Sequence, residues 1–85
     1  GWAFEHAAIT ETSLMMYLAP ELVREDKISD EMGAEPAAYV KYPIVEGMVP
    51  ASGVLAPAVS SSAEKGKLMT DEAISAFIEI ADRNF

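Results

Sequence analysis

The clearest hydrophobic pattern in the chain lies near its end. Apolar residues recur there three and four positions apart, and most charged residues fall outside the stripe they form, which consists of Met69, Ala73, Ala76, Phe77, Ile80 and Ala81. This spacing predicts an amphipathic helix. Ser61-Ser62-Ala63-Glu64 fits a capping box at its start, in which a serine and a glutamate three residues later satisfy each other's free backbone donors. The helix would be about 30 Å long, enough to cover one face of a sheet.

A second helix is predicted from Ala7 to Ala19. Leu14, Met15 and Leu18 have helical spacing, and Pro20 ends the segment because proline does not fit a helix interior. The apolar residues of this segment spread widely around the helix axis. We therefore expect a helix that is buried on most sides and needs neighbours that 85 residues can barely supply.

The middle of the chain is divided into short pieces by proline and glycine. The prolines are Pro36, Pro43, Pro50 and Pro57, and the glycines are Gly33, Gly47 and Gly53. One helical turn is expected within Asp26 to Met32. Short β-branched or aromatic stretches predict brief strands at Ala38 to Tyr42, Ile44 to Met48 and Val54 to Ala56.

Composition narrows the class of protein. With 51% hydrophobic and 24% charged residues, the chain is typical of globular rather than disordered material. At this length it would bury only about 60 to 65% of its unfolded surface, so its stability alone would be marginal. It has no cysteine, which excludes a disulfide scaffold and thiolate metal ligands. The formal charge of −8 argues against nucleic acid and anionic membranes as partners.

The ends and apolar runs of the sequence suggest a location. The longest apolar run, Leu14 to Pro20, is far shorter than the roughly 20 residues of a membrane span, and no signal peptide is recognisable. We therefore expect a soluble cytoplasmic protein. The chain begins Gly1-Trp2-Ala3-Phe4, with no initiator methionine and two large aromatics, which suggests a fragment or a processed chain.

Two residues near the start could carry chemistry. A helix through Glu11 would put this carboxylate on the same face as Met15 and Leu18, so it would need an ion-pair partner or a metal, and the pattern alone favours the structural alternative. His6 is the only histidine. Its side chain suits proton transfer near neutrality, although a single histidine is more often structural. On a continuous helix His6 and Glu11 would lie about 140° apart, which excludes a same-face metal pair, and two ligands do not close a metal site.

Other candidates have simpler explanations. Trp2 and Phe4 could line a pocket, but aromatics near a chain start more often pack in a core. The serines at 60 to 62 are better explained by helix capping than by nucleophilic catalysis, because no histidine lies near them in the sequence.

The segment from Glu5 to Ser13 reads Glu-His-Ala-Ala-Ile-Thr-Glu-Thr-Ser and is followed by Leu14-Met15 and by Ala-Pro-Glu-Leu-Val at 19 to 23. It resembles the creatininase (creatinine amidohydrolase) family motif, His-Ala-Gly, two variable residues and Glu-Thr-Ser before a helix. Gly53-Val54-Leu55 and the segment from Ser61 to Lys67 resemble that family's late loop and final helix. The resemblance covers essentially the whole chain and corresponds to about the last third of a family member.

The resemblance implies an α/β fold class. Residues 1–85 would be the C-terminal segment of a single creatininase-like domain, a three-layer α/β/α fold with a mainly parallel sheet, completed by an N-terminal segment not present in this chain. It further implies assembly into hexamers and two divalent metal ions, zinc or manganese.

The resemblance also implies roles for individual residues. His6 would be the catalytic histidine that handles the proton of the opening amide, Trp2 would close over the substrate, and Glu11 matches the acid that points toward the metal site. The reaction would be metal-assisted hydrolysis of a cyclic amide such as creatinine, with water activated by the ions. Two departures concern the substrate: Ala8 replaces the motif glycine, and Ala3 stands where creatininases tend to have a polar residue that contacts the substrate.

The family's other ligands, an early Glu-x-His and Asp group and a Gly-His segment, do not occur in this sequence. They would come from a preceding segment or from another chain. Two alternatives remain open at this stage. The same scaffold could act on a sugar-derived cyclic ketone or lactone, or on a peptide. The chain could instead be a non-catalytic acidic module that binds a partner protein, with His6 and Glu11 structural.

Overall fold

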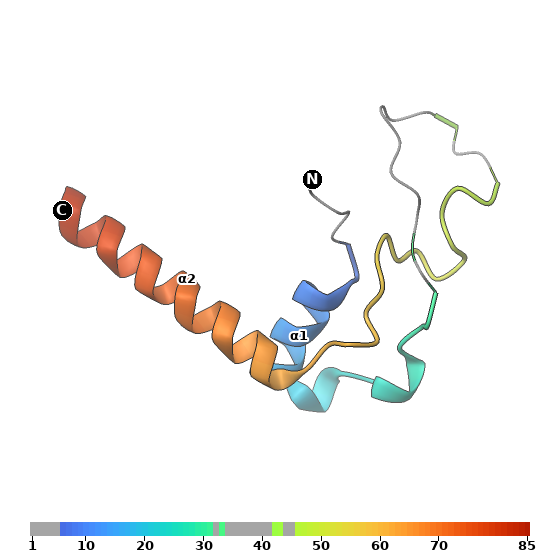
Figure 1. The fold of residues 1–85 in the computed structure, drawn as a ribbon, viewed down its shortest axis with the longest axis horizontal. Coiled ribbons are helices and arrows are strands. Elements are labelled where there is room, and N and C mark those ends of the chain that lie inside the picture. The colour runs from blue at the N-terminus through green and yellow to red at the C-terminus, as the bar shows by residue number, and fades with distance from the viewer. Residues whose placement is uncertain (1–5, 32, 34–41, 44–45) are drawn as a thin grey trace.

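The computed structural model describes residues 6–31, 33, 42–43 and 46–85. Two α-helices dominate it, α1 at Ile9–Leu18 and α2 at Ala63–Asn84. Two short 3-10 helices follow α1, η1 at Pro20–Leu22 and η2 at Glu25–Lys27. Figure 1 shows α1 crossing the beginning of α2, while the rest of α2 projects well beyond it.

Helix α1 confirms the helix expected from Ala7 to Ala19, with a later start. Ala7 has a φ of 51° and Ala8 is an extended N-cap, so neither residue continues the helix. The helix ends before Pro20, where the N–H of Ala19 donates to the carbonyl of Met15 at 2.8 Å. Its buried residues are Ser13 and Met16. The expectation of burial on most sides is therefore not met among the described residues.

Helix α2 confirms the predicted amphipathic helix, but the predicted capping box is wrong. The N-cap is Ser62, whose Oγ accepts a hydrogen bond from the N–H of Lys65 at 3.2 Å. Three residues after this cap stands Lys65 rather than Glu64, so the reciprocal glutamate bond of a capping box is not made. The hydroxyl of Ser61 instead donates to the carbonyl of Ala58 at 2.6 Å.

The two helices meet backbone to backbone at Gly66. A Cβ atom at this position would lie 2.0 Å from the carbonyl oxygen of Ser13 and 2.9 Å from the Cβ of Tyr17. Only glycine allows so close a crossing. Ser13 is fully buried there, and its Oγ accepts a hydrogen bond from the N–H of Ser62 at 3.1 Å. One serine side chain of α1 thus binds the N-cap residue of α2.

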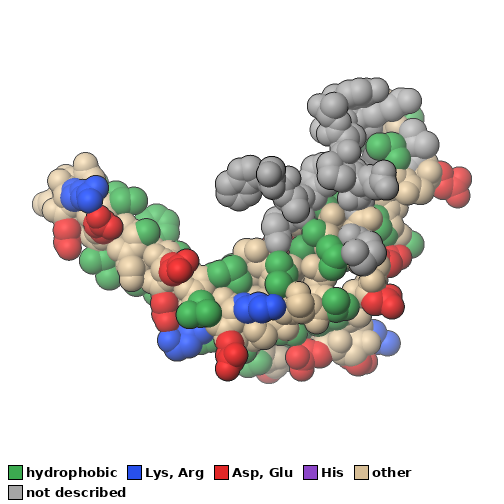
Figure 2. Space-filling view, in the orientation of Figure 1, with side chains coloured by type: hydrophobic (Ala, Val, Ile, Leu, Met, Phe, Trp, Pro, Cys, Tyr) green, Lys and Arg blue, Asp and Glu red, His purple; other side chains and the backbone are tan. Residues whose placement is uncertain are grey.

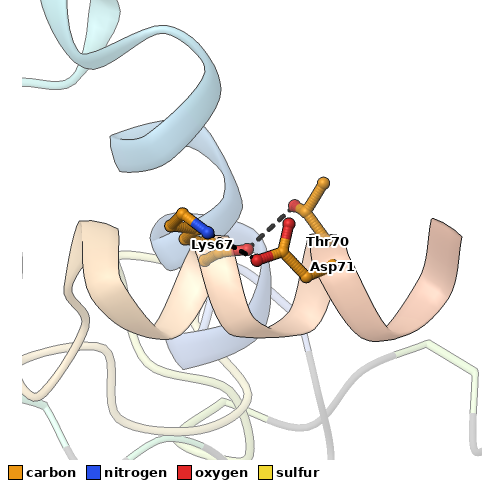
Figure 3. Close-up of polar contacts among 4 residues, drawn as sticks. Lys67, Thr70 and Asp71 are labelled. Carbon is orange, nitrogen blue, oxygen red and sulfur yellow. Dashed lines mark hydrogen bonds and ion pairs between the residues drawn. The ribbon is translucent and has the colours of Figure 1, made fainter. Parts of the chain in front are cut away.

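Beyond the crossing at Gly66, polar side chains of α2 make interactions within the helix. Thr70 donates from Oγ1 to the carbonyl of Gly66 at 2.8 Å, and Lys67 pairs with Asp71 one turn on at 2.6 Å (Figure 3). The hydrogen bond and charge of Asp71 raise the pKa of Lys67. Both members of the pair are exposed, so its contribution to stability is small.

The described chain has little core and much exposed apolar surface. Its buried hydrophobic residues are Ala8, Met16, Val54 and Ala58. The accessible surface is 6933 Å², whereas a compact monomer of this mass exposes about 4900 Å². The radius of gyration is 15.9 Å against about 12 Å for a compact chain of this length. The part of the chain that the structure describes is therefore not packed as a compact globule.

The C-terminal part of α2 carries exposed apolar side chains along its length. Every residue from 71 onward is exposed, including Phe77 at 72% and Ile80 at 54%. Figure 2 shows hydrophobic side chains along this projecting part of the helix, interspersed with charged ones. The amphipathic stripe thus has no partner among the residues that the structure describes. No helix in this part of the chain is long and apolar enough to cross a membrane.

The predictions for the middle of the chain are only partly testable. Val54 to Ala56 is irregular, so the strand predicted there is wrong. The predicted strands Ala38 to Tyr42 and Ile44 to Met48 lie largely outside the described residues, and their described ends form turns or bends. The turn expected within Asp26 to Met32 occurs slightly earlier, as η2. Within the described ranges there is no strand, so the sheet of the expected α/β fold is not seen there.

Candidate active site

His6 lies in a tight turn directly before α1. The side chain is exposed, and the next two residues take unusual roles. Ala7 has a left-handed backbone with a φ of 51°, and Ala8 is fully buried. A left-handed alanine costs about 1–2 kcal/mol, so surrounding contacts must hold the turn in this shape.

Two hydrogen bonds hold the peptide group that joins His6 to Ala7. Its carbonyl, from His6, accepts from the N–H of Leu55 at 3.1 Å. Its amide, from Ala7, donates to the Glu11 carboxylate oxygen Oε2. We call this pair of bonds the peptide clamp. Both polar groups of this planar peptide unit are hydrogen-bonded, so the clamp fixes the orientation of the peptide. It therefore also sets the direction of the bond from the backbone to the His6 side chain.

Leu55, whose N–H donates to the His6 carbonyl, is held in place by close packing against Gly33. Gly33 has a φ of 93°, and a Cβ atom there would lie 2.5 Å from the carbonyl carbon and oxygen of Leu55. Val54 and Ala58, on either side of Leu55 in the sequence, are buried. The loop that reaches His6 is thus held by close backbone packing on one side and by buried side chains.

The structure changes the interpretation of the pair His6 and Glu11. Their separation on a helical wheel does not apply, because α1 begins at Ile9 and His6 precedes it. Glu11 sits in the first turn of α1 and its carboxylate reaches back to the residue after His6. The clamp therefore links the Glu11 carboxylate to the peptide next to His6; the wheel argument excluded only a same-face metal pair on a continuous helix.

The role that Glu11 plays in the described structure was not foreseen. Sequence reasoning offered an ion pair or a metal, and in the described structure the carboxylate accepts a hydrogen bond from a backbone amide. A signal existed in the sequence, because Glu11 stands three residues after the N-cap Ala8, where a glutamate often bonds back to free amides before the helix. Sequence reasoning also missed Leu55, whose contribution comes from its backbone and leaves no signal in the side chain.

The described residues are too few to hold metal ions by themselves. No group of three or more His, Cys, Asp or Glu side chains in these ranges could bind an ion. His6 and Glu11 supply one imidazole and one carboxylate, while two divalent ions need a larger set of ligands. Trp2, the predicted substrate contact, lies outside the described residues.

A separate hollow lies between the helices. Its volume is about 240 Å³, and its walls are almost entirely apolar. It is lined by Ile9, Thr10, Lys65, Leu68 and Met69. Neither His6 nor Glu11 takes part in it, so the hollow is distinct from the turn that carries the candidate chemistry.

Comparison with known proteins gives a consistent result. The model of the creatininase family, described as creatinine amidohydrolase, matches residues 1–81. A creatinine amidohydrolase from Pseudomonas putida is 34% identical over 85 residues, which is all of this chain and 33% of that protein.

Two solved structures, a mutant creatininase of Zn-Zn type and one described as creatininase Mn, each superpose with a TM-score of 0.89 at 34% identity. Each match covers 100% of this chain and 33% of the other. The chain thus spans about a third of the length of these relatives, and over its length it has the backbone arrangement found in creatininases. It belongs to the creatininase family.

Proposed function

We propose that this chain is the C-terminal segment of a hydrolase that opens a cyclic amide, as creatinine amidohydrolase does. The observation that carries the proposal is the peptide clamp. It holds an exposed imidazole at the position where the chain resembles the family motif. The match of the whole chain to about a third of the creatinine amidohydrolase from Pseudomonas putida suggests the substrate class.

The proposal requires an N-terminal segment that completes the domain. The large accessible surface and the uncovered stripe of α2 support this requirement, because exposed apolar patches of this kind mark sites that another part of a protein covers. The predicted parallel sheet would lie in the completed domain, against this stripe. We use the term completed domain for this chain together with that segment.

In the proposed reaction His6 transfers protons. Water adds to the carbonyl carbon of the cyclic amide, the carbon–nitrogen bond breaks, and the leaving nitrogen takes up a proton. An imidazole suits this transfer because it can give and regain a proton near neutral pH. His6 is exposed among the described residues, which agrees with a ring that meets a substrate in the completed domain.

Two divalent metal ions, zinc or manganese, are part of the proposal, on the strength of the Zn-Zn and Mn forms of related creatininases. In the completed domain they would activate the water, and their ligands would come mainly from outside the described residues. Trp2 as a substrate contact remains a prediction, as do the hexamer and the cytoplasmic location; for Glu11, a direct bond to metal and a structural role are competing predictions.

The test is an assay of the completed domain, expressed from the full gene, with creatinine as substrate. We expect conversion to creatine, loss of activity on removal of metal by a chelator, and its return with zinc or manganese. His6→Ala should lower kcat by at least about 100-fold, the range that general acid–base catalysis contributes, with unchanged assembly in size-exclusion chromatography.

Glu21→Ala is the matched control, because Glu21 is an exposed residue of η1 with no contact to the clamp. Activity on a lactone, cyclic ketone or peptide instead of creatinine would keep the hydrolase scaffold and correct the substrate. A His6→Ala variant with full activity would refute the role of His6. The absence of hydrolysis of any of these compounds would favour the non-catalytic binding module.

A further inference from the structure

We infer that Glu11 is a positioning residue, which orients His6 by holding the amide of Ala7, and that this is its function in place of metal binding. The inference rests on the proposed function and assigns a role within it. Its basis is the peptide clamp, in which the Glu11 carboxylate is bonded to the backbone beside the catalytic histidine.

The left-handed conformation of Ala7 explains why such a bond is needed. Ala7 is the only residue other than glycine with a positive φ among the described residues. Without contacts that hold it, an alanine adopts the extended or right-handed helical region of φ/ψ space instead. Strained residues persist only where neighbouring groups hold them, and they occur preferentially at functional sites. The Glu11 carboxylate is the neighbouring group that bonds directly to the Ala7 amide.

The location of Glu11 makes it suited to this task. It lies in the first turn of α1, where a carboxylate is favoured by the helix dipole and by the free amides of the helix start. The helix is in turn held through Ser13, whose buried hydroxyl binds the N-cap of α2. A rigid helix therefore carries the carboxylate, and the carboxylate sets the turn that carries His6.

The second bond of the clamp shows what Glu11 adds. The N–H of Leu55 holds the carbonyl of His6, so the peptide remains attached to the loop when Glu11 is changed. One bond alone leaves the peptide plane free to rotate about the direction of that bond. Loss of Glu11 should therefore misorient the imidazole without detaching the turn, and an error of about 1 Å in such a position can cost about 100-fold in rate.

The experiment compares Glu11→Ala and Glu11→Gln in the completed domain. Glutamine keeps an oxygen that can accept the Ala7 N–H, but it lacks the charge of the carboxylates that bind zinc. We expect Glu11→Ala to lower kcat by about 10- to 100-fold with little change in KM, and Glu11→Gln to stay within several-fold of wild type. Both variants should keep the metal content of the wild type.

A double variant tests the mechanism of positioning. Glycine adopts a positive φ without penalty, so Ala7→Gly in the Glu11→Ala background should recover several-fold of the lost kcat. A metal-ligand role predicts no such recovery. Glu21→Gln, at an exposed glutamate outside the clamp, is the matched control and should match the wild type.

Hydrogen–deuterium exchange of the peptide that contains Ala7 gives a readout independent of activity. Exchange at this amide should be faster in Glu11→Ala and close to wild type in Glu11→Gln. Loss of metal in Glu11→Gln, or unchanged exchange in Glu11→Ala, would overturn the inference. If the wild type does not hydrolyse cyclic amides, the proposed function fails instead, and the exchange data still decide whether Glu11 holds the Ala7 amide.

Discussion

The crossing of α1 and α2 depends on the absence of a side chain at Gly66, so Gly66→Ala is a direct test of the packing. The added methyl carbon would lie 2.0 Å from the carbonyl oxygen of Ser13 and 2.6 Å from its carbonyl carbon. These are main-chain atoms of a helix, which cannot move aside as a flexible side chain can. The two helices would have to separate by about 1 Å or more, the difference from ordinary contact between non-bonded atoms.

The expected size of the effect follows from three contributions. Overpacking of a close contact costs about 1–3 kcal/mol. Separation also weakens the bond from the Ser62 N–H to the buried Ser13 hydroxyl, and an unsatisfied buried group costs about 1–3 kcal/mol. The better helix propensity of alanine returns only about 1 kcal/mol. We therefore expect Gly66→Ala to lower the free energy of unfolding by about 1–5 kcal/mol, with a central value of about 3 kcal/mol.

The measurement is urea unfolding of the completed domain. The free energies of unfolding of wild type and variant are compared where their m-values, the dependence of this free energy on urea concentration, are equal. The control that isolates helix propensity is Ser75→Ala compared with Ser75→Gly, at an exposed polar position of α2 outside the apolar stripe; the two variants should differ by about 1 kcal/mol. A Gly66→Ala protein as stable as the wild type would show that the helices do not cross as closely as described, and would refute the reasoning.

Four further outcomes are expected. Ser62→Ala should cost about 1 kcal/mol in urea unfolding through loss of the N-cap; a smaller effect than that of Ser61→Ala would mean that the cap lies at Ser61 after all. Ser13→Ala should cost about 1–3 kcal/mol by the same assay, because the Ser62 amide loses its buried acceptor. Asp71 raises the pKa of Lys67, so the ion pair is fully formed below the ordinary pKa of lysine and is lost as the pH rises through the raised pKa. Asp71→Asn should therefore lower the pKa of Lys67 in an NMR titration. An unchanged pKa would contradict the ion pair. The 85 residues alone should melt without a cooperative transition in far-ultraviolet circular dichroism, because the stripe of α2 is uncovered; a sharp two-state melt would contradict this.

The helices were predictable from the sequence because their signals are local. Pro20 ends α1, and the three- and four-residue spacing from Met69 to Ala81 defines α2. The motif around His6 identified the family without any knowledge of the fold. The capping position was wrong by one residue because Ser61 and Ser62 are equivalent as caps by composition, and only the backbone shows which of them the helix follows.

The strand predicted at Val54 to Ala56 failed for a different reason. A strand exists only when a neighbouring strand completes its hydrogen bonds, and within the described part of the chain none is adjacent. Leu55 instead gives its amide to His6, a contact between residues 49 positions apart. A pattern of β-branched residues cannot reveal which partner such an amide will find.

The sequence by itself determined where the helices form, the acidic character of the chain and the family motif, since each of these depends on residues close together along the chain. The tertiary structure alone decided that Glu11 turns back to the amide of Ala7, that Leu55 holds the carbonyl of His6 and that Gly66 admits the backbone of α1. The physical reason is that backbone hydrogen bonds and close contacts between distant segments depend on where the chain returns in space, and backbone groups are chemically alike at nearly every position.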